Sequence, residues 1–238
     1  IGNLTASTVI GKIDNDLVVQ GNAGNITYTA GVAVVAAADQ YAGAVGDLVW
    51  VGDIEANQTI WGTRGVTTMT TAGHDGTTVD FTIGGVDYSI LPAGKIDATV
   101  EYAGASTATA DAFIAKTGAG AATINYNVVG HDDNNNGVLT SAELGNGGNV
   151  AVSSVSGNII FKGATEDFDK GNIDYTHFAT LGNVALTTGQ NGTIALDFAD
   201  LDRNGIDDFD GKVGNITATS AAGSVTLNQS IFANSVGK

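Results

Sequence analysis

The sequence predicts an all-β protein, and both its patterning and its composition support this fold class. Apolar residues, mainly Val, Ile, Leu and Ala, alternate with Thr and other small polar residues, as in half-buried strands. The chain contains 34 Gly and a single proline, Pro92, and Asn is plentiful. Gly and Asn accept the backbone conformations of tight turns. We therefore expect antiparallel hairpins packed as a β-sandwich or jelly roll, with one or two short helices.

A loose repeat supports the hairpin interpretation. Each unit starts with Gly-Asn, continues as an alternating segment, turns at a glycine and alternates again. Units of this kind begin at Gly2, Gly24, Gly148, Gly182 and Gly214. The last three start 34 and 32 residues apart. This period is too irregular to predict a solenoid, so we interpret Gly-Asn as punctuation between strands.

The middle of the chain differs from these units. Residues 78–102 predict strands around Gly84-Gly85 and around the turn at 92–94, whereas residues 106–116 are the best helix candidate. The Ala-rich stretch 33–44 fits either a strand or a helix. A tentative boundary divides the chain into domains 1–128 and 129–238, with a single domain as the alternative.

Composition excludes several classes of function. The formal net charge is −16, which disfavours nucleic acid and anionic membrane surfaces as partners. Cysteine is absent, so neither a disulfide framework nor a thiolate site can form. No apolar run reaches the length of about 18 residues that a membrane span requires. Because the chain opens at Ile1 without a signal-peptide pattern, we expect a mature form or a fragment whose leader has been removed.

Residues 132–143 match the twelve-residue EF-hand calcium loop position by position. The predicted ligands are Asp132, Asn134, Asn136, the carbonyl of Val138, Thr140 and Glu143. Gly137 occupies the sixth position, where the loop turns sharply. The preceding segment reads as a strand, not as an entering helix. We therefore expect a structural Ca²⁺ that braces β elements, because a sensor needs a helix pair that opens.

A second segment, residues 200–210, carries the order D-x-D-x-N-G-I-x-D. It resembles the calcium repeats of thrombospondin type 3 and related bacterial surface proteins. The resemblance implies the ligands Asp200, Asp202, Asn204, the Ile206 carbonyl and Asp208, with Asp210 as a candidate to complete the shell. The twelfth position of that motif is Gly211 here and supplies no carboxylate.

Residues 166–174 form a weaker acidic segment. Glu166, Asp167, Asp169 and Asp174 could donate ligands to a neighbouring site, or they could form a solvated face. Oxygen-rich segments without Cys select Ca²⁺ over zinc or redox metals. The three histidines are far apart, and nucleophile-elbow, phosphate-loop and HExxH motifs are absent. We therefore predict a protein that is not an enzyme.

Together these features resemble prokaryotic surface-layer (S-layer) proteins and extracellular filament subunits. The resemblance rests on an acidic, cysteine-free chain that is nearly free of proline, rich in Thr, Val, Ala, Gly and Asn, and equipped with calcium loops. It implies β-sandwich modules, structural calcium and self-assembly outside the cell. Residues 1–10 and 225–236 are uncharged and β-prone, so either chain end could add to a neighbour's open sheet edge.

The alternative function is an adhesin or carbohydrate-binding module of a larger surface protein. Trp50 and Trp61 are its candidate stacking residues for a surface polysaccharide, although core packing is the better prediction for both. Self-association and polysaccharide binding are therefore the two partner hypotheses.

Overall fold

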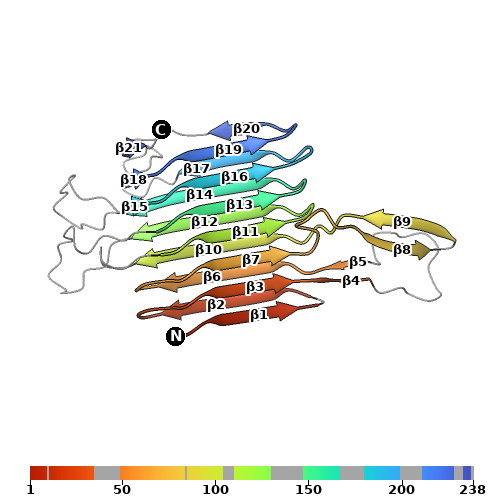
Figure 1. Ribbon diagram of the computed structural model, residues 1–238, viewed down its shortest axis with the longest axis horizontal. Coiled ribbons are helices and arrows are strands. Elements are labelled where there is room, and N and C mark those ends of the chain that lie inside the picture. The colour runs from red at the N-terminus through yellow and green to blue at the C-terminus, as the bar shows by residue number, and fades with distance from the viewer. Residues whose placement is uncertain are drawn as a thin grey trace.

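Successive strands of the chain enter two different sheets, so that the chain winds as a two-sheet parallel β-solenoid (Figure 1). The computed structural model describes residues 1–9, 11–34, 49–83, 85–103, 110–129, 147–166, 180–198, 211–227 and 233–236. The first sheet, sheet A, contains seven parallel strands in the spatial order β1 (Leu4–Thr8), β3 (Ile26–Ala30), β7 (Thr67–Thr71), β11 (Phe113–Thr117), β13 (Val150–Ser154), β16 (Val184–Thr188) and β19 (Ile216–Ser220). Sheet B contains the other seven, β2 (Ile13–Val19), β6 (Ile54–Ile60), β10 (Ile96–Ala103), β12 (Ala122–Val129), β14 (Ile159–Glu166), β17 (Ile194–Phe198) and β20 (Val225–Leu227).

One strand from each sheet makes one coil, and the strand order gives seven coils stacked from the N-terminal to the C-terminal end (Figure 1). Every neighbouring pair within a sheet is parallel and in register, for example Phe113 with Val150 and Ala122 with Ile159. We call the side where sheet A strands end and sheet B strands begin the hairpin edge. The opposite side, where sheet B strands end, is the loop edge.

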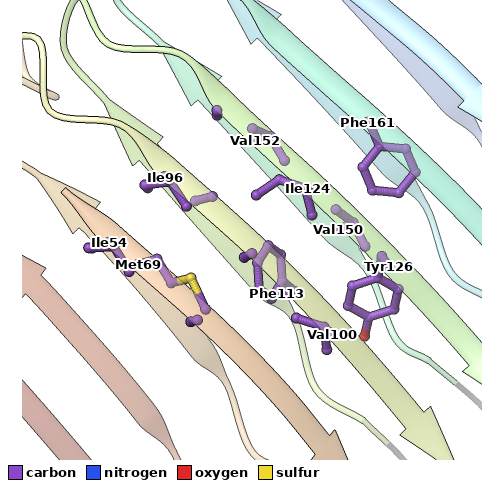
Figure 2. Packing of buried hydrophobic residues seen from close by; sticks show 14 of the residues in the cluster. Ile54, Met69, Ile96, Val100, Phe113, Ile124, Tyr126, Val150, Val152 and Phe161 are labelled. Atoms are coloured by element: carbon purple, nitrogen blue, oxygen red, sulfur yellow. The ribbon is translucent and has the colours of Figure 1, made fainter. Parts of the chain in front are cut away.

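The core lies between the two sheets and follows from strict alternation along each strand. In β11, Phe113, Ala115 and Thr117 are buried, whereas Ile114 is partly buried and Lys116 is exposed. Side chains from facing strands interdigitate, and the rings of Phe113 and Tyr126 meet edge to face with centroids 5.6 Å apart (Figure 2). Aliphatic residues stack above one another in sheet B: Ile54 pairs with Ile96 (Figure 2), and Ile159 pairs with Ile194. The core is therefore a column that each added coil extends.

Two antiparallel hairpins interrupt the winding. β4 (Val32–Val34) pairs with β5 (Val49–Val51), and β8 (Val79–Ile83) pairs with β9 (Val86–Ile90). Both hairpins connect a sheet A strand to a sheet B strand, so they project from the hairpin edge (Figure 1). The strands predicted on either side of Gly84-Gly85 are confirmed as β8 and β9, with Ile83 paired to Val86. A small parallel sheet of β15 (Thr180–Leu181), β18 (Gly211–Val213) and β21 (Ala233–Val236) lines the loop edge.

The predicted sandwich of antiparallel hairpins is wrong, although the all-β class is correct. In the units that begin at Gly2, Gly148, Gly182 and Gly214, the two strands belong to different main sheets, and each strand pairs in parallel with its equivalent one coil away. In the unit that begins at Gly24, the second strand is β4, which pairs antiparallel with β5. Period-2 alternation only requires one buried face, so it is the same for parallel and antiparallel strands. Gly and Asn serve solenoid corners as well as hairpin turns. The spacings of 34 and 32 residues are coil lengths, and the shortest coil takes 22.

The predicted helix at residues 106–116 is also wrong where the structure describes it, and no helix occurs in the described residues. Residues 113–117 form β11, since burial of every second side chain outweighs the helix propensity of Ala. Residues 104–109 lie outside the described residues, as does most of the stretch 33–44. Both main sheets continue across residue 129, with β12 paired to β14.

Candidate functional site

Each of the three acidic segments predicted from the sequence connects a sheet B strand to the next sheet A strand at the loop edge. β12, β14 and β17 are neighbours in sheet B, and the chain returns from them to β13, β16 and β19, which are neighbours in sheet A. The intervening segments therefore leave and re-enter the solenoid at adjacent coils. Parallel strands lie about 4.8 Å apart, so the ends of these segments are stacked along one edge.

The predicted calcium ligands themselves lie outside the described residues. The first set, Asp132 to Glu143, falls in 130–146, and the second set, Asp200 to Asp210, falls in 199–210. Asp167, Asp169 and Asp174 fall in 167–179. Within the described residues, no group of three or more His, Cys, Asp or Glu side chains is placed to hold a metal ion. Calcium binding at these residues stays a prediction.

The chain topology does show where these charges attach. Eleven of the 25 acidic residues lie in 130–146, 167–179 and 199–210, together with only two basic residues, Lys170 and Arg203. All three segments connect β strands at the loop edge. Carboxylates that are held close together repel one another, and cations neutralise such repulsion.

A ladder of asparagine side chains anchors the residues that follow these segments. The backbone N–H of Asn183 donates to Oδ1 of Asn149 over 2.8 Å, and the N–H of Asn215 donates to Oδ1 of Asn183 over 2.8 Å. The same bond joins Asn25 to Asn3 in the first coils. Each Asn thus satisfies a corner N–H of the next coil that no strand partner reaches.

The Gly of each Gly-Asn unit is explained by the same stack. A Cβ added to Gly182 would lie 2.5 Å from Oδ1 of Asn149, and one added to Gly214 would lie 2.5 Å from Oδ1 of Asn183. Only glycine allows the next coil to come this close. The Gly-Asn that begins each unit is therefore a corner of the solenoid at the loop edge, and the interpretation of Gly-Asn as punctuation between strands did not include this contact.

A fully buried arginine, Arg64, occupies the loop edge between the third and fourth coils. Its Nη1 donates to Oγ1 of Thr67 over 2.8 Å, and its Nη2 donates to the carbonyl of Asp111 over 3.1 Å and to Oη of Tyr126 over 2.7 Å. The guanidinium carbon lies 5.7 Å from the centre of the Tyr126 ring. Tyr126 in turn donates to the carbonyl of Gly147.

Arg64 joins β7, the residues before β11, and β12, and Tyr126 extends the contact to the residues before β13, so the role of Arg64 is to tie coils together. No ion pair within the described residues includes Arg64, and its Nε has no partner there. Sequence analysis did not single it out. Arg64 stands where Ala23 and Ala110 stand in the neighbouring coils, and a lone Arg in a turn is expected in solvent.

Buried tyrosines are expected to lower the free energy of unfolding at alkaline pH. Burial raises the pKa of Tyr102 to about 12 and also raises the pKa of Tyr126 and Tyr28. As pH rises above about 10 the unfolded chain loses these protons first, so the free energy of unfolding falls with pH. Urea midpoints at pH 8, 10 and 11 measure this, and we expect a decline above pH 10.

Tyr102→Phe is the matched variant, since Oη of Tyr102 has no partner within the described residues. It should keep the stability of the wild type at pH 8 and reduce the loss at pH 11. Equal midpoints of the wild type at pH 8 and 11 would contradict the prediction.

Trp61 follows β6 and is 36% exposed. Trp50 lies in β5, for which only the backbone is described. None of the described residues forms a helix that could cross a membrane.

These features define a class, a parallel two-sheet β-solenoid with acidic insertions along one edge. Comparison with protein-family models, curated proteins and solved structures finds no match to this chain.

Proposed function

We propose that the chain is an extracellular, calcium-braced structural subunit that self-assembles into a surface layer or filament on a prokaryotic cell. The observation that carries the proposal is the state of the two solenoid ends. β1 and β19 are the outermost strands of sheet A, β2 and β20 are those of sheet B, and within the described residues each has a partner on one side only. Folded proteins normally protect such edges with charge, proline or a covering segment.

Three of the four end strands carry no charged residue. β1 reads LTAST, β19 reads ITATS and β20 reads VTL. Val225 and Leu227 in β20 are 47% and 53% exposed, although their equivalents one coil below, Ile194 and Leu196, are 1% and 4% exposed. Uncharged edges with exposed apolar side chains favour association of sheets end to end.

Calcium fits this function as a brace of the loop edge. The two predicted loops are inserted after β12 and β17, and a bound ion would neutralise their carboxylates and fix the segments to neighbouring coils. The acidic segment 167–179 between them could supply further ligands. The absence of catalytic motifs from the sequence agrees with a structural role.

Calcium should raise thermal stability. If calcium binds only the folded state and its free concentration is 100 times the dissociation constant, the free energy of unfolding increases by about 2.7 kcal/mol. For a chain of this size, that increase raises Tm by several degrees. Scanning calorimetry with 5 mM CaCl₂ or with EGTA measures the rise. Glu143→Gln and Asp200→Asn should each reduce it, whereas Asp97→Asn, an exposed position on β10, should leave it unchanged.

Negative-stain electron microscopy of the same samples tests assembly. We expect filaments or sheets with calcium and fewer or shorter ones with EGTA. Monodisperse monomers under both conditions would refute the proposed function. A Tm that is equal with calcium and with EGTA would remove the calcium part of it.

A further inference from the structure

The two ends of the solenoid are complementary to each other. β19 and β1 belong to the same sheet and match position by position: Ile216 with Leu4, Thr217 with Thr5, Ala218 with Ala6, Thr219 with Ser7 and Ser220 with Thr8. Within the solenoid, parallel neighbours already pair residues of the same kind, for example Val150 with Val184 and Thr187 with Thr219. An eighth coil laid on β19 and β20 would therefore fit if it had the sequence of the first coil.

Apolar packing at the two ends is complementary as well. Val225 corresponds in register to Ile13, and both lie on the inner face of sheet B. Both ends leave these apolar side chains incompletely buried. Val225 is 47% exposed at the last coil, and Leu4, Ala6 and Leu17 are only partly buried at the first coil. Stacking the ends would extend the core column by one more layer and bury these side chains.

The asparagine ladder offers an acceptor at one end and a donor site at the other. Among the described residues, no N–H is donated to Oδ1 of Asn215, the last Asn of the ladder. At the first end, Gly2-Asn3 repeats the unit Gly24-Asn25, in which the N–H of Asn25 donates to Oδ1 of Asn3. A Cβ on Gly24 would lie 2.5 Å from Oδ1 of Asn3, but one on Gly2 would meet nothing within 4 Å. Gly2 is thus a glycine at a corner position, but in the single chain it lacks the close asparagine oxygen that requires glycine at the other corners.

Building on the proposed function, we propose that its subunit contact is head-to-tail stacking of coils between two copies of this chain. β1 and β2 of one copy add in parallel to β19 and β20 of the next, and the N–H of Asn3 donates to Oδ1 of the neighbour's Asn215. This contact joins two different surfaces and does not close on itself, so it generates an open fibre. Seven coils at about 4.8 Å each give a subunit repeat of about 34 Å.

One segment must move during stacking. Val236 of β21 pairs with Val213 of β18, and Val213 precedes a corner Gly as Ile1 precedes Gly2. Ile1 of the incoming copy would therefore occupy the position next to Val213 that Val236 occupies in the single chain. The end of β21 must leave this position when the copies assemble.

Two variants block opposite ends of the 238-residue chain. Gly2→Val places a branched side chain where Oδ1 of the neighbour's Asn215 must lie, and Val225→Lys places a charge in the new core layer. Both sites are open in the single chain, so the thermal midpoint measured by circular dichroism should stay within about 2 °C of wild type. Ser7→Ala, an exposed position on β1, is the matched control.

Sedimentation velocity reads out the assembly of each variant. We expect polymers from wild type and from Ser7→Ala, and monomers of 23.9 kDa from either blocking variant. An equimolar mixture of the two blocking variants should give dimers, because one intact end remains on each. Polymers from the blocking variants, or monomers from their mixture, would overturn coil stacking while leaving self-assembly in place. A monomeric wild type would overturn both proposals.

Discussion

Gly157→Ala is expected to destabilise the fold by about 3 kcal/mol or more, because the added methyl group has no space between coils. A Cβ at this position would lie 1.9 Å from the carbonyl oxygen of Gly120 and 2.5 Å from its carbonyl carbon. Both atoms belong to backbone, so no side chain can rotate away. The fourth and fifth coils would have to separate at the hairpin edge.

The clash would spread along the hairpin edge because the corner glycines form a continuous stack. A Cβ on Gly120 would meet the carbonyl of Gly94 at 2.0 Å, and one on Gly223 would meet the carbonyl of Gly192 at 2.0 Å. Buried hydroxyls bond to the same carbonyls: Oγ1 of Thr188 donates to Gly157 over 2.8 Å. Separating the coils at one glycine would break such bonds as well.

Urea denaturation followed by circular dichroism measures the effect of Gly157→Ala. Gly2→Ala is the control, since an added Cβ there meets nothing within 4 Å of the single chain, and in dilute samples of unassembled chains we expect its midpoint to match wild type. A Gly157→Ala chain as stable as wild type would show that the coils are not in contact at this corner.

Arg64→Ala is expected to cost about 3 to 5 kcal/mol of stability. The substitution removes a large, fully buried side chain and leaves the Tyr126 hydroxyl, the Thr67 hydroxyl and the Asp111 carbonyl without its N–H donors. Arg64→Lys should recover only part of the loss, because one ammonium group cannot reach three acceptors in a planar fork.

The exposed base Lys116 on β11 provides the control for charge. Lys116→Ala should change stability by less than about 0.5 kcal/mol, measured by the same urea denaturation. If Arg64→Ala were equally mild, the guanidinium would not be packed between coils as the structure places it.

Some features of the candidate site can be predicted from the sequence, and others require the structure. The ligand spacings at Asp132 and Asp200 are local patterns, so sequence alone could propose them, and they remain to be tested. That their segments share one edge is a property of the winding, which no local pattern contains. Arg64 could not be predicted either, because its burial depends on residues 47 and 62 positions away.

Sequence by itself determined the local features: an all-β chain, turns at glycine and asparagine, the hairpin of β8 and β9, and the starts of the Gly-Asn units. These follow from backbone preferences and from alternation, which act over a few residues. Only the tertiary structure decided which strands pair. A strand with one buried face can pair with its neighbour in sequence or with its equivalent one coil away. Here stacking of like residues, corner glycines and the asparagine ladder favours the equivalent strand, so the same segments form a parallel solenoid instead of a sandwich of hairpins.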